Sequence, residues 1–215
     1  MRVVSVQVGR PRTVLSKGRD VSTAIFKQPV TGRLMLRRLN LDGDEQADLT
    51  VHGGPEKAVY VYPVEHYPFW HAEYPEMGLP HGMFGENLTI EGLLENEVNV
   101  GDTFRIGGAE VVATQPRMPC YKLGIKFGRD DILKRFLRSR RTGWYFSVSR
   151  EGQIGPGDSI ERLSRDPHGL AITDVTRIYV EDRGNMDLLH RALAVPALPA
   201  SWRDYFQECL DRYTR

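Results

Sequence analysis

Up to about residue 164, short runs in which apolar and polar positions alternate follow one another, and Gly, Pro and Asp separate them. Alternation with a period of two predicts β-strands with one buried face. Gly107 and Gly108 join two of the runs and predict a hairpin, and the turn residues 155–158 precede the last run. The pattern predicts a mainly β fold with some helix, built on a curved or closed antiparallel sheet. We expect strands at residues 3–8, 23–27, 34–41, 103–106, 110–114, 144–148 and 159–163, interrupted by helices near 64–74 and 130–137.

Beyond residue 167 the pattern changes to apolar segments of helix length. Helix-start residues precede three such segments: Asp174 before 175–180, Asn185 before 188–193 and Ser201 before 202–213. Residues 168–215 contain six Arg and seven acidic residues, a balance that is poor for neutralising a phosphate backbone. We therefore predict three short helices that serve packing, dimerisation or substrate access and bind no nucleic acid.

Length, charge and cysteine content bound the class of protein. The 215 residues suffice for one large domain, or for one domain with a small appendage. A net charge of +1 gives no overall attraction to nucleic acid or to an acidic membrane. The chain has no window of about 18 apolar residues and starts with a strand-like pattern, so we expect neither a membrane span nor a signal peptide. Cys120 and Cys209 form no compact disulfide framework, which favours a cytoplasmic protein.

Basic residues gather in residues 117–141, where nine Lys or Arg accompany two acidic residues. The excess indicates contact with an anionic ligand or partner. For the charges beyond Lys126, a solvated helix face is the favoured explanation.

The most specific local pattern is Gln115-Pro116-Arg117-Met118-Pro119-Cys120-Tyr121-Lys122. Neighbouring cations lower the pKa of a thiol toward the thiolate that attacks or ligates. The two prolines restrict the backbone, so Cys120 is expected on a stiff loop. A small buried hydrophobic residue is the alternative interpretation of this cysteine, and the spacing alone leaves both open.

A second pattern is Val51-His52-Gly53-Gly54-Pro55-Glu56-Lys57-Ala58. The two glycines allow close approach of backbone N–H groups to a ligand, and Pro55 suits the first position of a helix. With Lys57 the segment is a candidate phosphate cradle. A tight turn is the alternative, and the oxyanion loop of an α/β-hydrolase is disfavoured because no Gly-x-Ser-x-Gly follows.

Two further observations limit the chemistry. Glu86 and Asn87 follow Gly85 before a strand and offer donors and acceptors to the edge of a heterocycle, although a local turn would use them equally. The spacing of His66 and His71 gives no zinc motif. An iron–sulfur cluster needs about four thiolates, and beside Cys120 the chain has only Cys209. The chain has no dinucleotide or Walker loop, so any redox reaction must draw its electrons from outside.

Segments 17–25, 44–55, 84–88, 115–123 and 143–148 closely resemble, in this order, the bacterial YiiM-like branch of the MOSC superfamily, named for the molybdenum-cofactor sulfurase C-terminal domain. The resemblance implies a Greek-key-like β-barrel, residues 1–167, followed by a three-helix C-terminal module, residues 168–215. It also implies reduction of N-hydroxylated compounds, such as hydroxylaminopurine, amidoximes and hydroxylamines, on a molybdenum cofactor (molybdopterin). This activity would detoxify its substrates.

By the same resemblance, Cys120 takes the place of the cysteine that ligates molybdenum, a role that suits a soft thiolate. Tyr121 and His52 are the candidate proton donors of the reaction. An external flavin or iron–sulfur reductase must dock, and the basic run could steer it; a homodimer through the C-terminal helices is a further expectation. The candidates for holding the phosphate and the pterin are His52, Gly53, Gly54, Lys57, Arg117 and Lys122, with Glu86, Asn87, Tyr121 and Tyr145 as wall residues.

Three other functions remain open on the sequence. The first is a sulfur or molybdenum-cofactor carrier that uses Cys120 as a persulfide or ligand. The second is a papain-like hydrolase that pairs Cys120 with His52. The third, a nucleic-acid-binding regulator, is disfavoured by the charge of the C-terminal helices.

Overall fold

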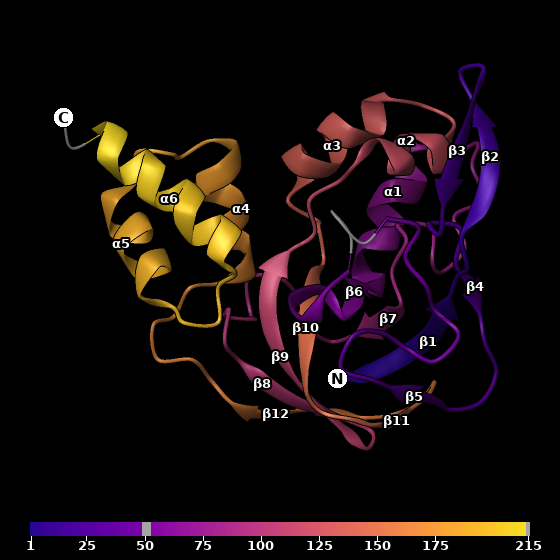
Figure 1. Cartoon of the computed structure of the whole chain (residues 1–215), viewed down its shortest axis with the longest axis horizontal. Helices are drawn as coiled ribbons and strands as arrows, with labels where there is room; N and C mark the ends of the chain where they lie inside the picture. Colours follow the sequence, from indigo (N-terminus) through magenta and orange to yellow (C-terminus); the bar gives the residue numbers. More distant parts are fainter. Residues whose placement is uncertain (49–52, 214–215) are drawn as a thin grey trace.

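The computed structural model describes residues 1–48 and 53–213. Its largest element is an eight-stranded sheet with the strand order β12-β8-β9-β10-β6-β7-β1-β4 (Figure 1). Two small sheets pair β2 with β3 and β5 with β11. The strands are β1 (Arg2–Val8), β2 (Arg12–Ser16), β3 (Arg19–Thr23), β4 (Gln28–Pro29), β5 (Leu34–Leu36), β6 (Val59–Pro63), β7 (Leu88–Glu91), β8 (Thr103–Ile106), β9 (Ala109–Pro116), β10 (Trp144–Arg150), β11 (Gly152–Ile154) and β12 (Ile160–Ser164).

The sheet-dominated fold class is confirmed, but the sheet does not close into a barrel. One edge of β1 pairs with β7. Its other edge pairs with β4 at Gln7 and Val8 and forms only an isolated bridge from Arg2 to Ser159 near β12. Because this edge is divided between two short contacts, no continuous ladder joins β1 to β12.

The expectation of an antiparallel sheet is wrong for one central pair. Strands β6 and β7 run parallel, with Val61 opposite Leu88. A parallel pair needs a long crossover connection. Residues 64–87 provide it, and they contain the 3₁₀ turn η2 (Val64–His66) and the helix α1 (Tyr67–Glu73) where a helix was expected.

Most elements with a clear turn signal were predicted correctly, including the hairpin at Gly107 and Gly108 and the helix α3 (Asp131–Ser139). The run 23–27 was predicted as a strand, but β3 ends at Thr23 and the following residues line a pocket. The strand β6 and the helix α2 (Tyr121–Phe127) were not expected. Every residue of β6 is buried, so the strand shows no alternation of apolar and polar positions.

The three expected C-terminal helices are present as α4 (Ile172–Val180), α5 (Met186–Ala194) and α6 (Ala200–Tyr213). Asn185 caps α5, since its side chain accepts a hydrogen bond from the Leu188 N–H at 3.1 Å. Asp174 lies inside the first turn of α4 and not at its cap, and its carboxylate accepts from the Ala171 N–H at 3.0 Å.

One hydrophobic core joins the sheet to these helices. Its buried side chains include Trp144 of the sheet together with Ile178, Leu189 and Phe206 of the helices. A second cluster, rich in aromatic rings, packs α1, α2 and α3 against the other part of the sheet. Among the described residues, no helix is long and apolar enough to cross a membrane.

Candidate functional site

Cys120 lies on the connection between β9 and α2, directly before the first turn of the helix. Its backbone is extended, with φ −113° and ψ 168°, and its side chain is partly exposed. The connection is tied to the sheet by the Arg117 N–H, which donates to the Gly143 carbonyl at 3.2 Å. The thiol therefore projects from a segment that is attached at both ends to regular structure.

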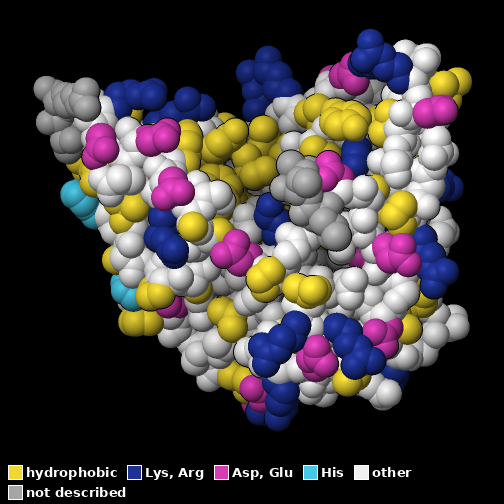
Figure 2. Space-filling model, viewed as in Figure 1, with side chains coloured by type: hydrophobic (Ala, Val, Ile, Leu, Met, Phe, Trp, Pro, Cys, Tyr) yellow, Lys and Arg dark blue, Asp and Glu magenta, His cyan; other side chains and the backbone are white. Residues whose placement is uncertain are grey.

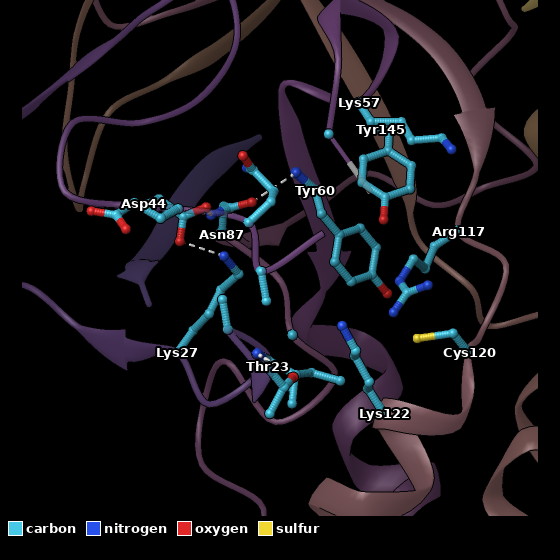
Figure 3. A pocket seen from close by; sticks show the side chains of 17 residues that line it. Thr23, Lys27, Asp44, Lys57, Tyr60, Asn87, Arg117, Cys120, Lys122 and Tyr145 are labelled. Atoms are coloured by element: carbon cyan, nitrogen blue, oxygen red, sulfur yellow. Dashed lines mark hydrogen bonds and ion pairs between the residues drawn. The ribbon is translucent and has the colours of Figure 1, made fainter. Parts of the chain in front are cut away.

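The thiol borders a narrow pocket of about 90 Å³, which we call the cationic pocket. The side chains of Lys27, Lys57, Arg117 and Lys122 line it together with Cys120 (Figure 3). They come from the loop after β3, the turn η1 (Pro55–Lys57), the end of β9 and the start of α2. Segments far apart in the sequence thus bring four cations and one sulfur to the same pocket.

Arg117 is 8% exposed, and its guanidinium points toward the Cys120 side chain (Figure 3). Burial lowers the pKa of Arg117, but Tyr145, Cys120 and Tyr60 together raise it by more, so the pKa ends above its ordinary value. The guanidinium is a permanent positive charge beside the thiol.

Lys57 and Lys122 add two further ammonium groups to the cationic pocket. Burial, followed by the charge of Arg117, lowers the pKa of Lys57 below its ordinary value. Lys122 is 9% exposed, and within residues 1–48 and 53–213 no hydrogen bond or ion pair joins its ammonium to another side chain or carbonyl. This ammonium is therefore available to an anionic ligand, with which it would form a charge-assisted hydrogen bond.

Lys27, which the sequence analysis did not single out, forms a buried ion pair with Asp44. The Asp44 carboxylate also accepts from the Gly9 N–H at 2.8 Å and from the Asn87 amide at 2.9 Å. Burial lowers the pKa of Lys27, and Asp44 opposes this change. Because its charge is balanced within the protein, Lys27 acts as a wall of the pocket.

Two tyrosines form the opposite wall. The rings of Tyr60 and Tyr145 lie 5.3 Å apart, and the Tyr60 hydroxyl donates to the Thr142 carbonyl at 2.7 Å. Burial raises the pKa of both phenols above the ordinary value, so both stay protonated at neutral pH. Tyr145 was predicted as a wall residue; Tyr60 was not, because the fully buried strand β6 gave no signal.

The structure places the other predicted residues unequally. Glu86 is fully buried away from the pocket and accepts from the Gly82 and Phe84 N–H groups and from the Tyr67 and Thr89 hydroxyls. Asn87 lines the pocket, but its amide is already bonded to the Tyr60 N–H and to Asp44.

Gly53 lines the pocket and has φ +91°, a backbone conformation that favours glycine. Gly54, with φ +88°, precedes η1, where Pro55 takes the first position as expected. Tyr121 is 58% exposed and lies outside the cationic pocket. His52 lies outside the described residues.

A wider groove of about 580 Å³ meets the cationic pocket at Lys57, Arg117, Cys120 and Tyr145. Its other walls are residues 115–121 on one side and the helices α4 and α6 on the other. Figure 2 shows hydrophobic side chains gathered along the cleft between the C-terminal helices and the rest of the molecule, with basic side chains at its base. Cys120 therefore stands at the junction of a small charged space and a larger, mostly aromatic one.

Several basic residues of the run 117–141 form ion pairs or hydrogen bonds with other residues of this chain. Arg129 pairs with Asp131, Arg135 with Glu73, and Arg140 with Glu181. The Lys126 ammonium donates to the Ile25 carbonyl at 2.8 Å and to the Gly82 carbonyl. The expected contact with an anion is thus concentrated on Arg117, Lys122 and their neighbours in the pocket.

Two family models match this chain, one over the sheet region and one over the C-terminal helices. The family model described as "MOSC domain" matches residues 48–161, and the model described as "YiiM-like, 3-alpha helix domain" matches residues 171–212. An uncharacterized protein of Bacillus subtilis, YflK, is 44% identical over 210 residues, which cover 98% of this chain and 95% of YflK.

A protein of Gibberella moniliformis named "Reductase" is 34% identical over 182 residues, 83% of this chain but only 32% of the fungal protein. The crystal structure of YiiM from Geobacillus stearothermophilus superimposes with a TM-score of 0.82 at 34% identity, covering 97% of this chain and 98% of that one.

Proposed function

Because this chain belongs to the MOSC domain family and has the YiiM-like three-helix domain, we propose that it binds a molybdenum cofactor through Cys120 and reduces N-hydroxylated compounds to amines or amidines. The observation that carries the proposal is the position of the Cys120 side chain, beside the Arg117 guanidinium at the junction of the cationic pocket and the groove.

The residues present suit such a cofactor. A thiolate is a soft ligand of the kind that molybdenum bound by sulfur takes. Cys120, whose thiol borders the cationic pocket, would be the protein ligand. Arg117, Lys122 and Lys57 would hold the phosphate, because buried cations bind phosphate oxygens through charge-assisted hydrogen bonds.

The reaction takes two electrons and two protons, breaks the N–O bond and releases the amine and water. When bound, the cofactor supplies the electrons. The chain must supply protons and hold the N–OH group near the Cys120 end of the groove.

Tyr145 and Tyr121 have different roles in this proposal. The raised pKa of Tyr145 keeps its phenol protonated, so it can donate a hydrogen bond to the substrate oxygen without losing its proton. Tyr121 lies at the exposed rim of the groove, a position in which a proton can be exchanged with solvent. His52 remains a prediction as a second donor.

The electron source and the assembly are also proposals. A flavin or iron–sulfur reductase would have to deliver electrons to this chain, and the name of the Gibberella relative supports a reductase in general terms. A homodimer through the C-terminal helices, cytoplasmic location and a role in detoxification are part of the same proposal.

The test compares Cys120→Ala with Cys209→Ala, both purified from a host that makes the cofactor and is fed molybdate. Cys209 is buried in α6 and far in sequence from the pocket, so its variant controls for the loss of a thiol. We expect the Cys120 variant to lose molybdenum, measured by elemental analysis, and to lose benzamidoxime reduction driven by a chemical reductant. The Cys209 variant should keep both. Equal molybdenum in the parent and the Cys120 variant, with similar melting temperatures, would contradict the proposal.

A further inference from the structure

The wall of the groove that faces residues 115–121 carries aromatic rings of the C-terminal helices. Tyr179 comes from α4, and Trp202 and Tyr205 come from α6. The ring of Tyr179 lies 5.6 Å from Trp202 and 5.4 Å from Tyr205, both in non-parallel orientations. Tyr121, from the first turn of α2, lies on the facing wall.

One of these rings is locked by a bond to the sheet. The Trp202 indole N–H donates to the Gln115 side-chain oxygen at 3.0 Å, and Gln115 belongs to β9 directly before the Cys120 connection. The bond satisfies the polar atom of the indole, so its ring remains as an apolar surface of fixed orientation. Trp202 is 7% exposed, which shows that the orientation is also held by packing.

Charge is distributed unevenly along the groove. Lys57 and Arg117 lie at the Cys120 end, and no carboxylate side chain of the described residues lines the groove. The α4 and α6 wall offers Ser201 and aromatic rings, and it contains no Lys, Arg, Asp or Glu side chain. A ligand there is selected by the shape and stacking of a flat ring and not by an ion pair.

We infer that the rings of Tyr121, Tyr179, Trp202 and Tyr205 form a binding site for the planar aromatic part of the substrate, so that the C-terminal helices select aromatic over small aliphatic N-hydroxylated compounds. The inference rests on the proposed function, because the groove leads to Cys120. A flat ring stacked on these side chains would leave its N–OH substituent to reach the part of the groove lined by Lys57, Arg117 and Cys120, where the N–O bond would be broken. The volume of about 580 Å³ lies in the range of small-molecule sites.

The first test measures binding without turnover. Trp70 and Trp144 are fully buried in the two cores, whereas Trp202 lies in the groove, so an aromatic ligand should quench chiefly the Trp202 fluorescence. We expect benzamidoxime to quench the emission of the purified protein and hydroxylamine to leave it unchanged. Trp202→Phe should abolish most of the response.

A matched pair of exposed tyrosines sharpens this titration. Tyr121→Leu should weaken benzamidoxime binding about five-fold, the effect of one aromatic contact. Tyr213→Leu removes a tyrosine of similar exposure, 56% against 58%, at the end of α6 and outside the groove, and should leave binding unchanged. No quenching, or equal effects of the two substitutions, would overturn the inference.

The second test uses turnover. Trp202→Leu should raise the KM for benzamidoxime about ten-fold and leave the KM for hydroxylamine and the molybdenum content as in the parent, while Trp202→Phe restores most of the difference. Because Trp202 also packs in the hydrophobic core, the melting temperature of each variant protein is measured alongside its kinetics. Loss of molybdenum in a folded Trp202→Leu variant would assign the rings to the cofactor and overturn the inference. A parent that reduces neither substrate but shows Tyr121-dependent quenching would refute the proposed function and still support the ring site.

Discussion

The two hollows that meet at Cys120 are built from different side chains. The cationic pocket gathers Lys27, Lys57, Arg117 and Lys122 from loops and turns around the sheet, whereas the groove takes neutral rings from helices of the C-terminal module. Charge attracts an anion strongly with modest demands on shape, and stacked rings discriminate by shape with little long-range attraction. The difference suggests a division of labour in which the pocket retains a charged group and the groove selects what reaches it.

The hollows also differ in how their side chains are held. In the pocket, a charge is balanced by another side chain, as in the Lys27–Asp44 pair, or is left for a ligand, as at Lys122. In the groove, orientation comes from the continuous hydrophobic core and from the bond between Trp202 and Gln115. Substitutions should therefore affect the pocket through ligand retention and the groove through selectivity.

The largest effect is expected where one segment supports both hollows. Gly143 has φ +61°, and its carbonyl holds the Arg117 N–H; a side chain at this position would clash with the Val61 carbonyl and the Tyr60 and Tyr62 rings. Gly143→Ala should lower the free energy of unfolding by about 3 kcal/mol. Urea unfolding measures this loss.

Gly157→Ala is the matched control, because Gly157 also has a positive φ, +89°, but has open space around it. It should cost about 1 kcal/mol, the cost of the left-handed backbone alone. Equal losses in the two variants would show that crowding at Gly143 does not hold the segment.

The next largest effect is on molybdenum retention, which should depend on the cations of the pocket and not on those of the surface. Arg117→Ala should increase the loss of molybdenum during dialysis by about ten-fold or more, because a buried guanidinium makes strong hydrogen bonds with an anion. Lys57→Ala should have a smaller effect, about three-fold, since Lys57 is only half-buried. Arg138, exposed on α3, is the control and its Ala variant should behave as the parent. If the three variants retain molybdenum equally, the anion is held elsewhere.

The smallest effect concerns the pH dependence of stability at Lys126, whose ammonium donates to the carbonyl of the pocket residue Ile25. Burial lowers the pKa of Lys126 from 10.5 to about 8. Between these values the unfolded chain binds more protons than the folded one at this position, so Lys126 makes stability rise with pH from about 8 to 10.5. The stability difference between the parent and Lys126→Met should shift in favour of the parent by on the order of 1 kcal/mol between pH 7.5 and 9.5. Urea unfolding at both pH values measures it, and a difference that does not change with pH would contradict the assignment.

Local signals in the sequence were sufficient for much of the fold. Gly107 and Gly108 marked a hairpin, Asn185 marked a helix start, and the Pro-Cys segment marked Cys120, because turns, caps and proline restraints act within a few residues. Resemblance of the segments around these positions also indicated the family, which the matching family models confirm.

The misses share one cause, which is that burial depends on distant neighbours. Glu86 was predicted to face the ligand, but its carboxylate turns inward to two backbone N–H groups and two hydroxyls, a set of partners that only the folded chain assembles. Strand β6 lacks alternation because both of its faces are covered, so Tyr60 was overlooked. Lys27 gave no signal because its partner Asp44 becomes its neighbour through the fold.

By itself, the sequence determined many of the strands, the thiol with its flanking cations and the helical character of the last residues, since short-range backbone preferences and apolar periodicity specify these. Only the tertiary structure decided which cations surround Cys120, that the sheet stays open at β1, and that the rings of α4 and α6 form a groove leading to the thiol. The physical reason is that pockets and unclosed sheet edges arise from contacts between residues far apart in the chain, which local patterns do not encode.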